Sequence, residues 1–338
     1  SAPLISTFTA SGSSLSIAGL LYAGTTLALA IVRLMKGRTQ DESPLQRRDA
    51  PALAGLILLG GIVGPVALVH GLARLPAASS SLLLNLETVF TLAIAVLVGR
   101  EHLGKRGAAA AALTIAGAIV LSDGSLGGVN ATGAALIALA TLAWGIDNNL
   151  SQRLSLRDPI QIATVKALGA SLPMLVLAWV LGHPFPPATV CAALLLVGAL
   201  GYGLSIWLDL LALRDLGAAR EAVIFSTAPF VGALFALVVL RDSFTLNLSV
   251  AAGLMGSGVV LLLREEHSYW HQHHALRHDH RHCHDLAAGD LHHEHEHSPQ
   301  ELEGMDTDHP FWHAHEHEHS QTAHAHPHVS DVHHRHPH

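Results

Sequence analysis

A single carboxylate stands inside a long apolar stretch of the chain. Glu87 lies in SSSLLLNLETVFTLAIAVLVGREHL, residues 79–103, and no other charged residue occurs between Arg74 and Arg100. Burying an unpaired carboxylate deep in a membrane is costly, so this group must be protonated, paired or in contact with water. Two roles fit Glu87. It can bind a cationic substrate group or a proton in a central cavity, or it can form a structural hydrogen bond or ion pair with a neighbouring helix.

A second polar group follows at the end of another apolar run, in WGIDNNL. Asp147, Asn148 and Asn149 lie within about a turn of the end of that run, and Lys166 lies near the start of the next one. This spacing permits an ion pair between Asp147 and Lys166 across the hairpin, which we expect; the alternative is contact with a substrate. Trp144, one turn earlier, can wall the same cavity or pack against lipid.

Uncharged polar residues at corresponding places of two apolar runs are further candidates for substrate contact. Asn85 lies two residues before Glu87, and Ser226 and Thr227 lie just before Pro229. A proline inside a helix frees a backbone carbonyl, which can bind a ligand or simply permit a kink. Asn85, Ser226 and Thr227 therefore join the candidate substrate or coupling residues.

The end of the chain is a separate histidine-rich segment. Residues 265–338 hold 24 of the 27 histidines, and 14 acidic residues against three arginines. This composition cannot form a packed core, so a disordered tail is predicted. Alternating imidazoles and carboxylates suit zinc, nickel, copper or cobalt at modest affinity, although the expected function requires no cofactor. The candidate metal ligands are His292, His293, His295, His297, His313, His315, His317 and His319.

The remainder of the chain has the composition of a multi-pass membrane protein. The chain is 50% hydrophobic and 13% charged, and its mean hydropathy is +0.39. Before residue 265 it consists of repeated apolar runs of about 20 residues, the length that crosses a hydrocarbon core. We expect nine transmembrane helices, near residues 15–35, 52–73, 77–99, 107–122, 131–150, 160–182, 190–213, 219–240 and 245–263.

Basic residues are divided unequally between alternate connections of these helices. Thirteen Lys and Arg residues fall on one side, and only Arg74 and Arg241 fall on the other. Because cytoplasmic connections retain Lys and Arg, the first side is predicted to be cytoplasmic, and so is the tail after Arg264. Asp209, near that side, is expected to pair with Arg214 or to reach water.

The two halves of the apolar region repeat each other. A shift of 141 residues aligns LPAASSSLLLNLETVFTLAIAVLVGRE with LGAAREAVIFSTAPFVGALFALVVLRD, and it continues without a gap to place Gly117 on Gly258. Five predicted helices separate the matched ones, so the second copy enters the membrane in the opposite direction, as in transporters that work by alternating access. The helix over 131–150 has no counterpart beyond residues 1–9, so the first copy is expected to lack its first helix.

These stretches, with WGIDNNLSQRLSLRDPIQIATVKALGA and the tail, resemble the EamA-domain family of the drug/metabolite transporter (DMT) superfamily, specifically a bacterial subgroup with a His-rich C-terminal tail. The resemblance implies an all-α polytopic membrane protein with two inverted repeats of about five transmembrane helices. The first repeat, residues 1–122, is expected to lack its first helix; the second is expected to span residues 130–264, and the tail residues 265–338. It also implies transport of small metabolites, amino acids or drugs across the bacterial inner membrane.

The leading interpretation is a secondary transporter, specifically an exporter, of a small organic solute through the lipid bilayer. Two alternatives remain, transition-metal transport and membrane-anchored metal buffering by the tail, although the predicted spans hold few metal ligands beyond His70 and Cys191. The sequence has no phosphate-binding glycine loop, zinc-protease helix or nucleophile motif, so no enzyme is expected. A net charge of −7 argues against nucleic-acid binding. The oligomeric state stays open.

Overall fold

The first half of the chain is a series of helices. Two of the long helical segments, Arg47–Leu72 and Ala77–Leu97, are each built from shorter elements that follow one another closely. The computed structural model describes residues 2–36, 43–98, 105–122, 130–154, 157–215, 225–264, 268–273, 276–284, 311–319 and 322–327. The first-half elements are α1 (Ala2–Ser6), α2 (Ser14–Lys36), the 3₁₀-helix η1 (Arg47–Asp49), α3 (Ala50–Gly55), the π-helix η2 (Leu56–Val63), α4 (Gly64–Leu72), α5 (Ala77–Leu83), α6 (Leu86–Leu97) and α7 (Lys105–Ser122).

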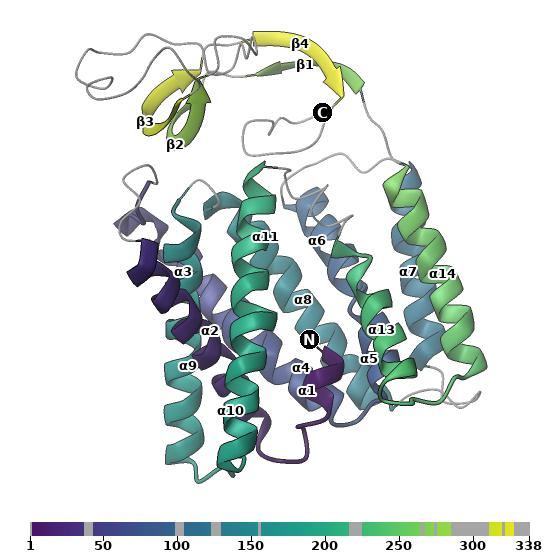
Figure 1. The fold of residues 1–338 in the computed structure, drawn as a ribbon. Helices are drawn as coiled ribbons and strands as arrows, with labels where there is room; N and C mark the ends of the chain where they lie inside the picture. The colour runs from purple at the N-terminus through teal and green to yellow at the C-terminus, as the bar shows by residue number, and fades with distance from the viewer. Residues whose placement is uncertain are drawn as a thin grey trace.

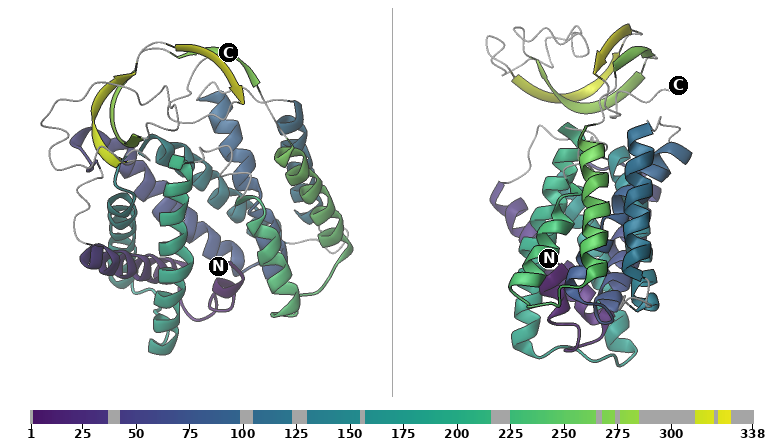
Figure 2. Two further views of the ribbon diagram at one scale, coloured as in Figure 1. Left: turned by 45° about the horizontal axis from the view of Figure 1, so that its top comes forward. Right: turned by 90° about the vertical axis from the view of Figure 1, so that its right-hand side faces the viewer.

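The second half follows the same plan (Figure 1). Its elements are α8 (Ala131–Leu154), α9 (Pro159–Val180), α10 (Ala188–Val197), the π-helix η4 (Gly198–Gly203), α11 (Leu204–Asp215), α13 (Ala228–Val238) and α14 (Leu246–Leu263). The helices form one bundle, and the described strands of the tail lie at one end of it (Figure 2).

Six helical segments of the described chain are long and apolar enough to cross a membrane. They are Ser14–Met35, Arg47–Leu72, Ala77–Leu97, Pro159–Val180, Ala188–Ala212 and Leu246–Leu263. The other three predicted spans correspond to α7, α8 and the shorter apolar helix α13. Large apolar side chains such as Leu34, Leu97 and Trp179 are more than three quarters exposed. Such an exposed apolar surface fits contact with lipid rather than with water.

The structure confirms the predicted repeat. The 141-residue shift carries the bounds of α7 onto those of α14 and carries the π-helix η2 onto η4, within one residue at each end. The copies are also inverted, because α7 and α14 run antiparallel. Asn247 at the start of α14 donates to the Val120 carbonyl near the end of α7 at 3.2 Å, and Arg106 at the start of α7 donates to the Arg264 carbonyl after α14.

Two glycines at equivalent places of the repeat let α7 and α14 approach closely. A Cβ at Gly117 would lie 2.7 Å from Met255 Cγ, and a Cβ at Gly258 would lie 2.9 Å from the Ala110 carbonyl oxygen. Small residues of this kind bring transmembrane helix backbones together. The sequence predicted that only residues 1–9 correspond to the first helix of the second copy. In the structure these residues include the short helix α1, which the same shift places on residues 143–147 of α8.

Short parts of the histidine-rich tail are described as paired strands, and the disorder predicted for the tail as a whole stays a prediction. Strand β1 (Ser268–His273) pairs antiparallel with β4 (Thr322–Pro327), and β2 (Leu276–His284) pairs antiparallel with β3 (Phe311–His319). The local pattern fits these strands, because histidine alternates with other residues in HDHRHCH and HAHEHEH. A period of two places alternate residues on opposite faces of a strand, and composition alone does not reveal it.

Candidate functional site

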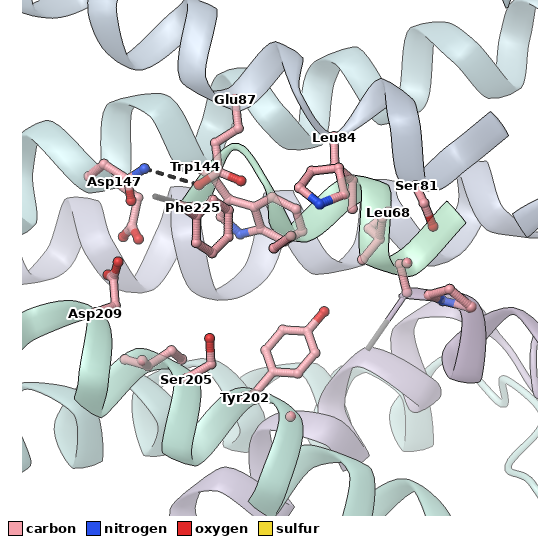
Figure 3. Close-up of a pocket in the computed structure, with 18 of the residues that line it drawn as sticks. Leu68, Ser81, Leu84, Glu87, Trp144, Asp147, Tyr202, Ser205, Asp209 and Phe225 are labelled. Carbon is pink, nitrogen blue, oxygen red and sulfur yellow. Dashed lines mark hydrogen bonds between the residues drawn. The ribbon is translucent and has the colours of Figure 1, made fainter. Parts of the chain in front are cut away.

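A cavity of about 280 Å³ lies inside the helix bundle, between the two repeats (Figure 3). Its lining comes from α1, α2, α4, α5, α6 and from α8, α9, η4, α11 and α13, so both halves contribute. The volume is close to the lower end, ~300 Å³, of common small-molecule sites. The cavity therefore suits a small solute and is the candidate substrate site.

Glu87 lies on the wall of this cavity, and its residue is 8% exposed. Its Oε1 accepts a hydrogen bond from Asn148 Nδ2 at 3.0 Å, and the same nitrogen lies 3.3 Å from Thr91 Oγ1. Of the two roles that the sequence left open for Glu87, the structural hydrogen bond to the neighbouring helix α8 is present. The carboxylate also lines the cavity, and its binding of a cation or a proton stays a prediction. One carboxylate oxygen is held by α8, which fixes the orientation of the group.

An interruption between α5 and α6 explains why Glu87 points into the cavity. The backbone N–H groups of Leu84 and Glu87 donate to carbonyls three residues earlier, those of Ser81 and Leu84, at 3.2 and 3.0 Å. Side chains three residues apart eclipse one another under such bonding. Ser81, Leu84 and Glu87 accordingly share one face of this segment, and all three line the cavity.

Asp147 and Lys166 form the ion pair that the sequence predicts across the α8–α9 hairpin. Lys166 Nζ lies 2.5 Å from Asp147 Oδ2, and the two side chains are 6% and 7% exposed. Both line the cavity. The other oxygen, Asp147 Oδ1, has no hydrogen-bond partner among the described residues and lies against Gly60 of the π-helix η2.

Replacing Gly60 by alanine is expected to lower the free energy of unfolding by about 1–3 kcal/mol, the usual range for overpacking. A Cβ at this position would lie 2.1 Å from Asp147 Oδ1, so the ion pair or the helix must shift. Thermal unfolding of the purified protein in detergent measures the effect. Gly253→Ala is the matched control, because a Cβ there meets nothing within 4 Å. Equal unfolding temperatures for the two variants would show that Gly60 does not set this packing.

Four aromatic side chains surround the polar groups. Tyr22 Oη donates to the Gly60 carbonyl at 2.8 Å, and Trp144 Nε1 donates to the same oxygen at 3.1 Å. The rings of Tyr22 and Tyr202 lie 5.5 Å apart between centroids, and Phe225 completes the set. Trp144 thus walls the cavity, which was one of its two predicted roles. Tyr22, Tyr202 and Phe225 were not predicted, because an aromatic residue in an apolar run is usually a packing residue.

Asp209 also lines the cavity, together with Tyr202 and Ser205, across from Glu87 (Figure 3). The expected pairing of Asp209 with Arg214 stays a prediction, because the Arg214 side chain lies outside the described residues. The π-helix η4 leads directly into α11, and residues spaced by three or four positions share one face of a helix. The spacing of Tyr202, Ser205 and Asp209 therefore indicated that they share one helix face. This spacing was not used to predict the site, because Asp209 lies near the end of its apolar run.

Two of the predicted asparagines serve the backbone rather than the cavity. Asn85 Nδ2 donates to the Leu82 carbonyl at 3.1 Å, and Asn149 Nδ2 donates to the carbonyls of Gly145 and Thr91 at 2.8 and 3.2 Å. Neither residue is part of the cavity lining. Both stabilise helix segments next to the site.

Ser226 and Thr227 are also absent from the cavity lining. Ser226 is buried, and Thr227 lies immediately before α13. Phe225, Ala228 and Pro229 face the cavity instead. The 141-residue shift matches Phe225 with Leu84 and Ala228 with Glu87, so the repeat placed the correct segment beside the cavity but with an apolar lining.

The structure describes only part of the predicted metal ligands. Within the described part of the chain, no three His, Cys, Asp or Glu residues are placed to hold a metal ion. The backbone of strand β3 includes four of these histidines, namely His313, His315, His317 and His319. The other four lie outside the described residues; they are His292, His293, His295 and His297. Metal binding by the tail stays a prediction.

Comparison with known proteins decides the family. The EamA-like transporter family matches residues 1–123 and 131–264, which is most of the chain and both repeats. The chain belongs to the EamA-like transporter family. The predicted resemblance to EamA-domain transporters is thereby confirmed, and the protein is a multi-pass membrane transporter. EamA proteins are transporters rather than enzymes, in agreement with the lack of catalytic motifs.

Individual relatives agree with membership of the EamA family. An uncharacterized transporter from Methanothermobacter thermautotrophicus (strain Delta H) is 29% identical over 253 residues, which cover 73% of this chain and 72% of that protein. A protein of known crystal structure superposes with a TM-score of 0.55 at 17% identity, over 76% of this chain and 90% of that one. At this low sequence identity, the structural similarity shows only that the two proteins share a fold.

Proposed function

We propose that this EamA-family protein is a secondary transporter that exports a small organic cation through the central cavity by alternating access. The observation that carries the proposal is the Glu87 carboxylate, which lines a small cavity in the middle of the bundle and is oriented there by Asn148. A carboxylate in such a low-dielectric place interacts strongly with a cation, because little water screens the charge.

The rest of the cavity supports a cationic solute with an apolar body. Asp209 adds a second carboxylate on the opposite wall, whereas the ammonium of Lys166 is already engaged by Asp147. Aromatic faces such as those of Tyr202 and Trp144 attract cations and pack against apolar groups. Amines, including amino compounds and cationic drugs, meet these requirements better than a simple carboxylate does.

The positions of the acidic groups support export as the proposed direction of transport. Asp147 and Asp209 are seven and six residues before the ends of α8 and α11, the ends that the distribution of Lys and Arg assigns to the cytoplasm. A cation that enters from the cytoplasm therefore meets these carboxylates first, which favours capture from inside the cell. The proposed location is the bacterial inner membrane, with the tail in the cytoplasm as an accessory segment that can bind zinc, nickel, copper or cobalt.

Inside-out membrane vesicles test this function, because their outer face is the cytoplasmic face. Vesicles that contain the full chain are expected to accumulate radiolabelled organic amines above vesicles without the protein, and not to accumulate matched carboxylates. A chain that ends at Arg264 should give the same result. Accumulation of nickel, cobalt or zinc alone, and only with the tail present, would replace this proposal by the metal hypotheses.

A further inference from the structure

The end of the cavity away from the acidic groups has a polar atom of its own. Ser81, on α5, lines the cavity and is 1% exposed, and its hydroxyl has no hydrogen-bond partner among the described residues. Figure 3 shows Ser81 at the opposite end of the cavity from Asp147 and Asp209. Buried hydroxyl groups in proteins almost always have a hydrogen-bond partner. A hydroxyl without one at a cavity wall therefore points to a ligand group that binds in the cavity.

We propose that Ser81 forms a second substrate subsite, which binds a hydroxyl, carbonyl or amide group at the end of the substrate remote from its positive charge. This inference rests on the proposed function, because it assumes that the cationic group binds at Glu87. It narrows the substrate class to molecules with an ammonium group at one end, an apolar middle and a hydrogen-bonding group at the other end.

The wall between the two subsites has the matching character. Six residues separate Ser81 from Glu87, which corresponds to about 9–12 Å along the helical segment, depending on whether the rise is that of an α-helix or a 3₁₀-helix. Leu84 lies between them on the same face, and Leu68 and Phe225 also line the cavity. A substrate that reaches both ends therefore passes an apolar middle section that can hold an aromatic ring or a short alkyl chain.

Gly232, on the facing helix α13, places no side chain against the buried Ser81 hydroxyl. A Cβ at Gly232 on α13 would lie 3.0 Å from Ser81 Oγ and 3.7 Å from Pro3 Cγ. Any side chain at this position would therefore press against the hydroxyl and occupy part of this end of the cavity. The absence of a side chain at Gly232 is what the second subsite requires.

Binding of two amines that differ by one hydroxyl tests the subsite. The probes are tyramine and phenethylamine, and their affinities for the full-length purified protein in lipid nanodiscs are measured by calorimetry. One hydrogen bond corresponds to about a tenfold difference in affinity, so the protein should bind tyramine about tenfold more tightly. Ser81→Ala should remove that preference without weakening phenethylamine. Ser81→Thr, which retains a hydroxyl, should retain part of it, and Gly232→Ala should weaken tyramine binding by a similar factor.

Ser80→Ala is the matched control, because the Ser80 hydroxyl is also buried without a described partner but does not line the cavity. It should leave the ratio of the two affinities unchanged. The subsite is refuted if Ser81→Ala keeps the preference for tyramine, or if Ser80→Ala removes it equally. If both amines bind equally well and depend on Glu87, only the subsite falls. If neither amine binds, the proposed function fails and the subsite fails with it.

Discussion

Replacing Glu87 by glutamine is expected to reduce transport of organic cations by about 10–100-fold, since interactions with a charged group contribute about 1.5–3 kcal/mol. Glutamine has nearly the same shape, and its carbonyl oxygen can still accept the hydrogen bond from Asn148. The substitution therefore removes the negative charge that faces the cavity and leaves the packing of α6 against α8 in place. Glu87→Asp keeps the charge on a shorter side chain and should show an intermediate rate.

Initial rates of amine accumulation in inside-out vesicles measure this effect across a range of substrate concentrations. Asp158→Asn is the matched control, because it makes the same carboxylate-to-amide change outside the cavity. Asp158 accepts hydrogen bonds from the backbone N–H groups of Ile160 and Gln161 at the start of α9, a capping role that asparagine fulfils equally well. Rates for Glu87→Gln that match those of the control would show that Glu87 does not contact the transported cation.

The sequence was sufficient to predict the charged residues of this site, because charged residues are unusual inside a membrane. Glu87, Asp147 and Lys166 are charged residues in apolar runs, and their cost in lipid requires a partner or a polar cavity. The structure provides both, through Asn148, the Asp147–Lys166 ion pair and the cavity itself. The antiparallel repeat was also predictable, because one constant shift of the chain matched two consecutive helices.

The rest of the cavity depends on details of helix geometry that residue types do not reveal. The interruption at Leu84–Asn85 places Ser81 on the same face as Glu87, although six residues in a regular α-helix would point them in different directions. The π-helices η2 and η4 likewise change which residues face inward, and π-helical turns often occur at functional sites. Tyr22, Tyr202 and Ser81 were therefore missed, and three of the candidates, Asn85, Ser226 and Thr227, do not line the cavity.

The ion pair of the site gives the second large effect. Lys166→Met is expected to lower the free energy of unfolding by about 3–5 kcal/mol, because it leaves the buried Asp147 carboxylate without its cation. Asp147→Asn alone should be destabilising for the converse reason. The double variant removes both charges with little change in volume, and replacing a buried ion pair by neutral groups is often nearly neutral. The double variant should therefore recover most of the stability that either single change removes.

Thermal unfolding of the four proteins in one detergent, at one heating rate, provides the double-mutant cycle. A large coupling means that the pair acts as a unit in holding α8 against α9, since each partner is needed only while the other is present. If the double variant is stable but inactive, Asp147 or Lys166 also contacts the solute. A double variant as unstable as Lys166→Met would instead contradict a stabilising ion pair, and the short Lys166–Asp147 contact would then reflect only the space that Gly60 leaves beside α8.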